Sequence, residues 1–404
     1  MTLENLFASR TQHMRASEIR ELLKLLEQPG ILSFAGGIPD PALFPSDAFA
    51  KAYASALTPE RQAGSLQYSV SEGYLPLRKW IADRMALFGV ACSVENVLIT
   101  SGSQQALDYL GKLFLSPNDT ALVRWPTYMG ALGAFRAYEP RFDRLSLGAN
   151  RPVQDLKDAA QASGGSVKFA YLSSDFSNPT GETVDRQGRE QLLDLAEALN
   201  SAVIEDAAYQ ELRFDGDFVP PILAIELERK GHIDACRTIY CGSFSKTLSP
   251  GLRVGWVVAA QPVIQQLVLT KQASDLHSPT INQIVIHDVA ARMFETHLAK
   301  LREHYGSRRD AMLSALERHM PNGVAWTKPE GGMFVWLTLP EGMNGADLLA
   351  DALRTEQVAF VPGAAFFPDG SGENTLRLNF SSPNIEQINE GMLRLGRVLR
   401  GSMN

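Results

Sequence analysis

The chain has 404 residues, a formal net charge of −7, 45% hydrophobic residues and 21% charged residues. This composition is that of an ordinary globular protein with room for two domains, and it disfavours disorder, a fibrous repeat or nucleic acid as the main partner. Three cysteines without metal-like spacing and a polar N-terminus predict reduced thiols in a cytoplasmic protein, and no apolar run reaches the ~20 residues of a membrane span.

The first elements of the chain are a short helix and an irregular loop. Ser17 is placed to cap a helix over residues 18–27, whose apolar side chains recur on one face. Residues 33–45 contain two adjacent glycines and three prolines, a composition that excludes a regular element. We expect residues 1–45 to form an N-terminal unit of a helix followed by a loop that lets backbone approach a ligand closely.

From about residue 70, short apolar runs alternate with segments of helical period. Such alternation predicts an α/β fold in which helices cover a mostly parallel sheet. The predicted strands are 96–100, 120–123, 167–172, 202–206, 238–241 and 255–258, and the clearest helices are 75–88, 186–199 and one from Gln104. A long helical pattern over 281–319 precedes strands at 332–337, 358–361 and 376–379. We therefore expect a large domain over 46–290 and a smaller α+β domain over 291–404.

Polar residues follow several of these strands, at the ends where open parallel sheets bind ligands. Asp206 ends one run, Asn178 and Lys246 follow two others, and the turn 101–104 follows a fourth. An amine, a carboxylate, an amide and an anion-binding turn are the groups that pyridoxal 5′-phosphate (PLP) needs from a protein. Taken singly, Lys246 would more often be a solvated lysine in a turn, and Asp206 could be a helix cap.

The order of motifs along the chain resembles that of the fold-type I PLP enzymes, within the class I aminotransferases. The most similar branch is that of the 2-aminoadipate, kynurenine and aromatic or multi-substrate aminotransferases. Each motif is weak alone, but their joint occurrence in order is specific. The segments that carry the resemblance are residues 33–41, 67–69, 100–106, 124–128, 177–181 (Ser-Asn-Pro-Thr-Gly), 205–209, 243–256 (beginning Ser-Phe-Ser-Lys) and 376–380.

The resemblance implies a catalytic group and a cofactor-ring site. Lys246 matches the lysine that holds the cofactor as a Schiff base and later moves a substrate proton. Asp206 matches the partner of the pyridine nitrogen. Asn178 and Tyr209 match the donors to the 3-oxygen, and Tyr128 matches the aromatic residue that stacks on the ring. Lys246, Asp206 and Tyr209 are the expected catalytic residues.

The resemblance also implies a phosphate site and a second subunit. Ser243 and Arg253, together with the turn at Ser103 and Gln104, match the residues that grip the phosphate. Tyr68 matches a tyrosine that reaches the phosphate of the neighbouring subunit. The expected active unit is therefore a homodimer that shares its sites at the interface.

Substrate contacts follow from the same comparison. Arg377, with Asn178 nearby, matches the arginine that binds the substrate α-carboxylate, and Gly36 and Gly37 match a loop that lies over the substrate. Arg20 lies on the predicted N-terminal helix and is a candidate for a side-chain carboxylate. A solvated position on the outer face of the helix is the slightly favoured alternative for Arg20.

The expected reaction is transfer of the amino group of an L-amino acid to a 2-oxo acid, with 2-oxoglutarate as the default acceptor and ping-pong kinetics. The preferred donor stays open between 2-aminoadipate or glutamate, aromatic and aliphatic amino acids. Two alternatives are a PLP-dependent lyase on the same fold and an aminotransferase-like domain that senses a ligand in a regulator. The seven histidines show no zinc-like spacing, so no metal is expected.

Overall fold

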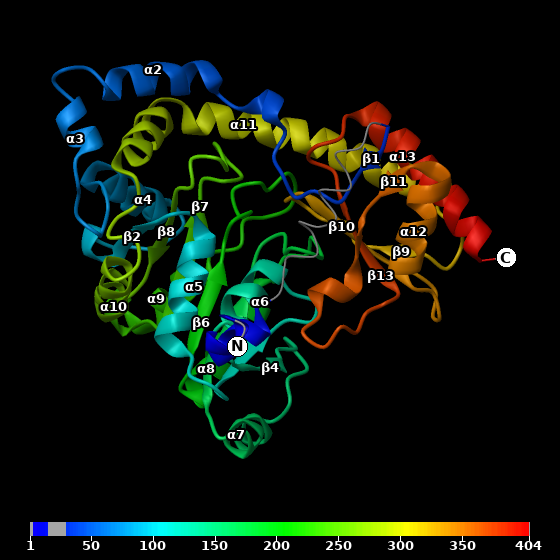
Figure 1. Cartoon of the computed structure of the whole chain (residues 1–404), viewed down its shortest axis with the longest axis horizontal. Helices are drawn as coiled ribbons and strands as arrows, with labels where there is room; N and C mark the ends of the chain where they lie inside the picture. Colours follow the sequence, from blue (N-terminus) through cyan, green and yellow to red (C-terminus); the bar gives the residue numbers. More distant parts are fainter. Residues whose placement is uncertain (1–2, 15–29, 404) are drawn as a thin grey trace.

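A seven-stranded sheet lies at the centre of the large part of the molecule (Figure 1). The computed structural model describes residues 3–14 and 30–403. The strand order is β2-β8-β7-β6-β5-β3-β4, and every neighbouring pair is parallel except the two that involve β8. The expected mostly parallel α/β sheet is therefore confirmed. Its strands are β2 (Val97–Thr100), β3 (Thr120–Val123), β4 (Arg141–Arg144), β5 (Val167–Leu172), β6 (Ala202–Asp206), β7 (Thr238–Ser243) and β8 (Gly255–Val258).

Helices cover both faces of this sheet, which explains why its inner strands are continuous apolar runs. Successive residues of a strand face opposite layers. In β6, Ile204 packs in a cluster with residues of α5, α6 and α10, whereas Val203 packs with residues of α7, α8 and α9. The covering helices are α4 (Leu75–Leu87), α5 (Ser103–Phe114), α6 (Met129–Arg136), α7 (Val153–Ala162), α8 (Arg186–Leu199), α9 (Ile222–Lys230) and α10 (Gln261–Gln272).

The C-terminal third builds a second, antiparallel sheet in the order β12-β13-β10-β9. Its strands are β9 (Ala325–Trp326), β10 (Phe334–Thr338), β12 (Val361–Pro362) and β13 (Thr375–Asn379), flanked by α12 (Gly345–Glu356) and α13 (Ile385–Ser402). The long helix α11 (Thr280–His319) runs along the top of the molecule in Figure 1 and contacts α4 as well as α13. It thus connects the two sheets.

The N-terminal segment joins the C-terminal third. Strand β1 (Leu32–Ser33) pairs in parallel with β11 (Val358–Ala359), so the loop that follows β1 starts beside the small sheet. The chain then returns across the molecule through α2 (Ser46–Ala56), which packs on α11, and α3 (Gln62–Leu66). The irregular segment 34–45 therefore runs from the small sheet towards the large one.

The structure differs from the sequence predictions at two strands, and one predicted helix lies outside the described residues. Strand β4 was not predicted, because Arg-Phe-Asp-Arg at a sheet edge has neither an apolar run nor clean alternation. The predicted strand 358–361 is two strands, β11 and β12, that belong to different sheets. The helix expected over 18–27 lies outside the described residues. No described helix is both long and apolar enough to cross a membrane.

Gly391 of α13 lies against Phe34 of the N-terminal segment, so a substitution there tests this packing. A Cβ at Gly391 would lie 2.3 Å from the ring of the buried Phe34, whereas a Cβ at Gly401 of the same helix would touch nothing within 4 Å. Helix propensity favours alanine at both sites by roughly 1 kcal/mol. Overpacking at Gly391 costs about 1–3 kcal/mol. We expect Gly391→Ala to lower the thermal unfolding midpoint and Gly401→Ala to leave it unchanged or raise it. Equal midpoints for the two variants would contradict this packing.

Candidate active site

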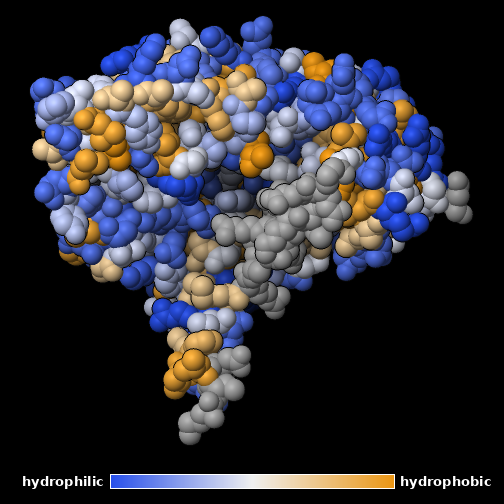
Figure 2. All heavy atoms as spheres, turned by 45° about the horizontal axis from the view of Figure 1, so that its top comes forward, coloured by the Kyte–Doolittle hydropathy of each residue, from blue (hydrophilic) through white to orange (hydrophobic). Residues whose placement is uncertain are grey.

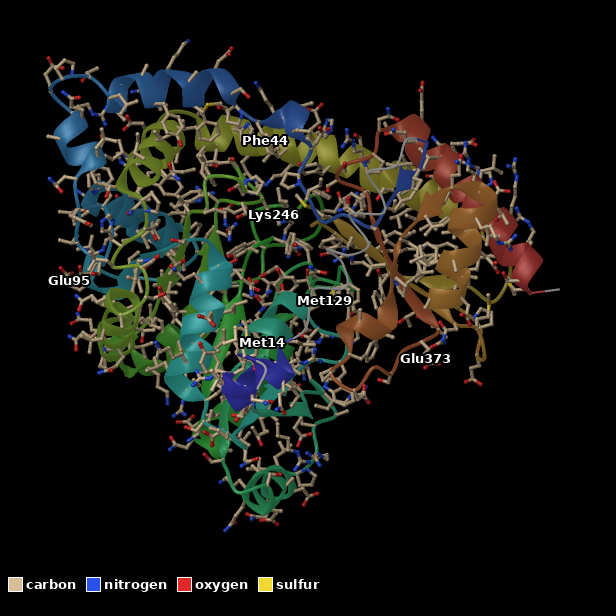
Figure 3. All side chains as sticks on the ribbon, in the orientation of Figure 1. Met14, Phe44, Glu95, Met129, Lys246 and Glu373 are labelled. Atoms are coloured by element: carbon tan, nitrogen blue, oxygen red, sulfur yellow. The ribbon has the colours of Figure 1, made fainter. Side chains whose placement is uncertain are left out.

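Lys246 lies between the two sheets, in the turn that follows β7 (Figure 3). Its side chain is half-buried, and Nζ donates a hydrogen bond to the carbonyl oxygen of Gly37 at 2.7 Å. Burial lowers the pKa of Lys246 to about 8, with further lowering by the positive charges of Arg377 and Arg253 and an opposing effect of Asp206. A lysine with such a pKa is partly neutral at physiological pH and can act as a nucleophile or base.

Asp206 is the last residue of β6 and is almost fully buried, at 5% exposure. One carboxylate oxygen, Oδ2, accepts a hydrogen bond from the Tyr171 hydroxyl at 2.8 Å. The other, Oδ1, is buried without a hydrogen-bond partner among the described residues. Burial raises the pKa of Asp206 from its ordinary value of 3.8 to about 6, although the hydrogen bond from Tyr171 opposes this rise. An unpaired buried carboxylate oxygen is costly and indicates a missing donor.

Arg377 is a fully buried guanidinium in β13. Nη1 donates to Oδ1 of Asn178 at 2.7 Å and Nη2 donates to the carbonyl oxygen of Ala35 at 2.8 Å. The guanidinium carbon lies 4.3 Å and 5.0 Å from the ring centres of Phe334 and Phe366. Nε has no hydrogen-bond partner in the described part of the chain. Burial lowers the pKa of Arg377 to about 10. All its recorded acceptors are neutral, so the group is suited to a carboxylate.

The turn before α5 forms a second positively charged site. Gly102 has φ +82° and precedes a helix whose first N–H groups receive no side-chain cap. A Cβ at Gly102 would lie 2.4 Å from Nη2 of Arg253, so the guanidinium rests directly on this glycine. Arg253 Nη2 also donates to the carbonyl oxygen of Ser101 at 3.3 Å. Open N–H groups at a helix start beside a guanidinium are the usual surroundings of a bound phosphate.

Other expected residues line the space between these groups. Tyr209 is buried, and its ring centre lies 5.7 Å from Nζ of Lys246. Tyr128 is half-buried and lies across Gly130, where a Cβ would be 2.3 Å from its ring. Ser243 ends β7, and its hydroxyl bonds with that of Ser245 at 2.8 Å. The side chain of Gln104, also expected here, donates to the carbonyl oxygen of Gly130 at 2.7 Å.

The loop with Gly36 and Gly37 is held against the site by its backbone. The carbonyl oxygen of Gly37 accepts from Lys246, and that of Ile38 accepts from the Ser381 hydroxyl at 2.7 Å. Further along, Asp40 accepts from Nη2 of Arg308 on α11 at 2.6 Å. The loop therefore contacts both Lys246 and Arg377.

Two residues expected at this site are not found there in the described part of the chain. Tyr68 is 79% exposed and has its ring edge against His277, with ring centres 6.0 Å apart. Arg20 lies outside the described residues. Conversely, sequence reasoning missed Tyr171, Ala35 and the two phenylalanines next to Arg377. Their positions depend on strand register and on the path of the loop, neither of which can be predicted from the pattern of apolar residues.

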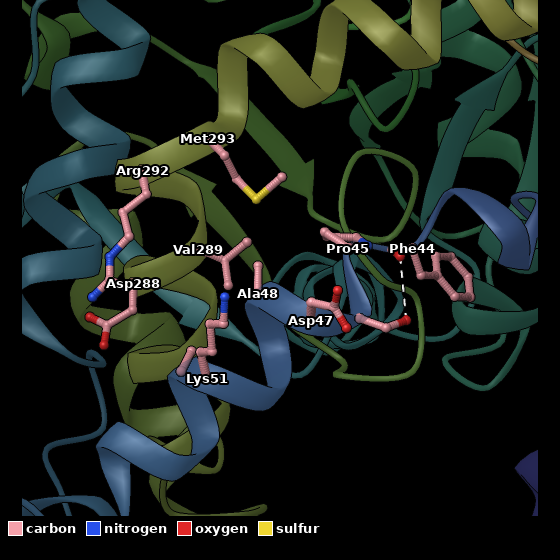
Figure 4. A pocket seen from close by; sticks show the side chains of 11 residues that line it. Phe44, Pro45, Asp47, Ala48, Lys51, Asp288, Val289, Arg292 and Met293 are labelled. Atoms are coloured by element: carbon pink, nitrogen blue, oxygen red, sulfur yellow. Dashed lines mark hydrogen bonds between the residues drawn. The ribbon is translucent and has the colours of Figure 1, made fainter.

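The molecule is hollowed near the middle of the face seen in Figure 2. A small cavity adjoins Lys246 and is lined also by Phe44, His297 and Tyr305. A larger open cavity of about 550 Å³ lies elsewhere, between the start of α2 and the first half of α11 (Figure 4). Its lining includes Phe44, Lys51, Asp288 and Arg292 but none of the expected site residues. The chemistry thus points to the space around Lys246.

The residues present fit PLP. The free oxygen of Asp206 can accept from a protonated pyridine nitrogen, Lys246 offers an amine of lowered pKa, and the turn at Gly102 with Arg253 offers a phosphate site. No group of three or more His, Cys, Asp or Glu side chains in the described part of the chain could hold a metal ion.

Comparison with known proteins supports the same chemistry. Residues 37–395 match the family of class I and II aminotransferases. The chain is 44% identical to a 2-aminoadipate transaminase of Thermus thermophilus, over 98% of this chain and 96% of that protein. It is 41% identical to aromatic-amino-acid aminotransferase 1 of Thermococcus litoralis, over 99% and 95%.

The solved structures agree. LysN, an α-aminoadipate aminotransferase of Thermus thermophilus complexed with N-(5′-phosphopyridoxyl)-L-leucine, superposes with a TM-score of 0.88 at 42% identity, covering 100% of this chain and 99% of its own. The resemblance inferred from the sequence motifs is confirmed by these matches over nearly the whole chain. This protein belongs to the class I and II aminotransferases, and it is an aminotransferase with pyridoxal phosphate as its cofactor.

Proposed function

We propose that the enzyme transfers the amino group of 2-aminoadipate, glutamate or an aromatic amino acid to 2-oxoglutarate by a ping-pong mechanism. The observation that carries this proposal is the buried Arg377, whose recorded hydrogen-bond acceptors are neutral and which lies under the same loop as Lys246. An α-carboxylate bound there would place the α-carbon near the Lys246 amine. The donor classes come from the names of the relatives, a 2-aminoadipate transaminase and an aromatic aminotransferase.

The proposal assigns the cofactor ring to the space between Lys246, Asp206 and Tyr128. When bound, PLP supplies an electrophilic carbon for the amino group and an electron sink for the substrate carbanion. Asp206 would hold the ring nitrogen protonated through its free oxygen, and Tyr128 would stack on the ring. Tyr209 and Asn178 would donate to the 3-oxygen.

The phosphate would lie at the N-terminus of α5, held by Ser103, Gln104, Ser243 and Arg253. The side chain of Gln104 already bonds to Gly130, so its backbone N–H is the group we assign to the phosphate. Tyr68, 79% exposed in one chain, would reach the phosphate of a second subunit. A homodimer is part of this proposal.

Lys246 would act as the base that moves the proton of the substrate α-carbon. Its lowered pKa leaves a useful neutral fraction near physiological pH. Arg377 and Asn178 would orient the α-carboxylate, and the loop at Gly36 and Gly37 would cover the substrate and exclude water. The same site would accept the 2-oxo acid in the second half-reaction, since both substrates share the carboxylate.

The first test uses the PLP-loaded enzyme without added oxo acid. We expect L-glutamate or 2-aminoadipate to change the absorbance of the bound cofactor and to yield one equivalent of 2-oxo acid with no ammonia. Lys246→Ala should abolish this conversion, because the base is lost. Catalytic release of ammonia would instead favour a lyase. A spectrum that responds to no donor of either class would contradict the proposed substrates.

The raised pKa of the buried Asp206 predicts that the stability of the unloaded protein depends on pH. Its pKa in the folded chain, about 6, exceeds its ordinary value of 3.8, so the folded state binds more protons between these values and loses stability as pH rises through them. We expect the unloaded wild type to lose about 2–3 kcal/mol of unfolding free energy relative to Asp206→Asn between about pH 4 and pH 7. Denaturant titrations at several pH values measure this difference. A difference that does not vary with pH would show that Asp206 titrates normally.

Arg20 is the candidate partner for the side-chain carboxylate of 2-aminoadipate or glutamate, and a solvated position on its predicted helix is the alternative. A lost charge-assisted hydrogen bond is worth about 1.5–3 kcal/mol, so Arg20→Ala should raise KM for 2-aminoadipate about tenfold or more and leave KM for leucine and phenylalanine nearly unchanged. Lys24→Ala, on the same predicted helix, is the matched control. Equal effects of Arg20→Ala on both substrate classes would remove this residue from the pocket.

A further inference from the structure

A lysine that the proposed mechanism does not use is fully buried at the end of α10. The Nζ atom of Lys271 donates to both carboxylate oxygens of Asp275 at 3.0 Å, to Oε1 of Gln105 at 2.9 Å and to the Ser278 hydroxyl at 3.0 Å. A buried ammonium costs several kcal/mol unless it is paired and hydrogen-bonded. A buried ammonium with several defined acceptors can fix the geometry of the groups around it.

The buried ammonium lies directly behind the turn that precedes α5, a helix that packs beside α10 (Figure 1). The backbone N–H of Ser101 donates to Oε1 of Gln105 at 2.8 Å. The hydroxyl of Ser101 donates to Asp275 at 3.2 Å and lies 3.0 Å from the Ser278 hydroxyl. Within the described part of the chain, the N–H and the hydroxyl of Ser101 thus hydrogen-bond only to residues that also bind the ammonium, namely Gln105, Asp275 and Ser278. The carbonyl oxygen of Ser101 accepts from Arg253 on the opposite side.

Asp275, the acidic partner of Lys271, also accepts several hydrogen bonds. Asp275 accepts also from Nε2 of Gln105 at 2.7 Å and from the Tyr109 hydroxyl at 3.2 Å. Burial would raise the pKa of Asp275, but the hydrogen bonds from Gln105 and Lys271 outweigh it and keep the carboxylate ionised. The pair is therefore neutral as a whole and acts on the turn through geometry more than through net charge.

The segment after α10 also supports the part of the chain that carries Tyr68. The ring of His277 packs against Tyr68, and the carbonyl oxygen of Ser278 accepts from Nε2 of Gln283 at 2.8 Å. Oε1 of Gln283 in turn accepts from the backbone N–H of Tyr74 at 2.7 Å. One cluster of hydrogen bonds and ring contacts thereby links the turn at Ser101 to the segment next to Tyr68.

We propose that Lys271 and Asp275 are positioning residues for the cofactor phosphate, which hold Ser101 so that the N–H groups at Ser103 and Gln104 stay aimed at it. This inference rests on the proposed placement of the phosphate at this turn. A binding site that is already ordered loses less entropy when the ligand binds. Loosening the turn should therefore weaken binding of the phosphate and leave the interactions of the aldehyde and the ring unchanged.

Pyridoxal, which lacks the phosphate, separates these effects. The dissociation constants of PLP and pyridoxal are measured by absorbance titration of the unloaded full chain. For Lys271→Met we expect the constant for PLP to rise about tenfold or more, with that for pyridoxal nearly unchanged. A role in general stability would weaken both ligands alike. A folded variant in which both constants change by the same factor, or in which neither changes, overturns the inference.

Two milder variants and one reference complete the experiment. Ser278→Ala and Asp275→Asn keep the volume of the cluster nearly unchanged and should raise the ratio of the two constants less strongly. If Lys271→Met fails to fold, an unchanged ratio in both milder variants overturns the inference. Arg253→Met is the reference for the phosphate site itself. If it does not weaken PLP selectively, the proposed placement of the phosphate is wrong; if it does while the cluster variants do not, only the role of Lys271 and Asp275 fails.

Discussion

The arrangement of the site depends on one buried positive charge. Arg377 lies inside the small sheet with two aromatic rings at its guanidinium and neutral oxygens as its recorded partners. Desolvation of such a charge is expensive, and the chain offsets part of it with Asn178, from the loop that follows β5 of the large sheet, and with the backbone of Ala35 from the N-terminal loop. The two sheets and the loop therefore meet at this residue. A substrate carboxylate would complete the charge balance that the protein leaves open.

Burial shifts the pKa values of Lys246 and Asp206 in opposite directions. It lowers the pKa of Lys246 to about 8 and raises that of Asp206 to about 6, so each is brought towards neutrality. The Tyr171 hydroxyl counters the rise at Asp206, which keeps a carboxylate available where a pyridinium would need it. Both groups lie at the ends of buried strands of the same sheet, and the loop at Gly37 covers the amine. Burial thus shifts both pKa values at the place where we propose that the cofactor ring binds.

The turn before α5, where we propose that the phosphate binds, is stabilised by contacts on both of its sides. Gly102 has no side chain because Arg253 occupies that space, and Gly255 allows β8 to approach the turn closely. Behind the turn lies an ion pair that is sealed from solvent on the lysine side. A turn fixed in this way would lose less entropy on binding an anion, in keeping with the proposed phosphate site.

The sequence by itself determined six of the seven strands of the large sheet and the polar residues that follow them. Buried apolar runs such as Ala202–Asp206 are local signals, and the motifs around Asn178, Lys246 and Arg377 were sufficient for the family. Edge strand β4, the bond from Tyr171 to Asp206 and the burial of Lys271 were decided only by the tertiary structure. Each depends on strand register or on helices far apart in sequence coming together, and a side chain's own sequence neighbourhood carries no information about a partner that is distant along the chain.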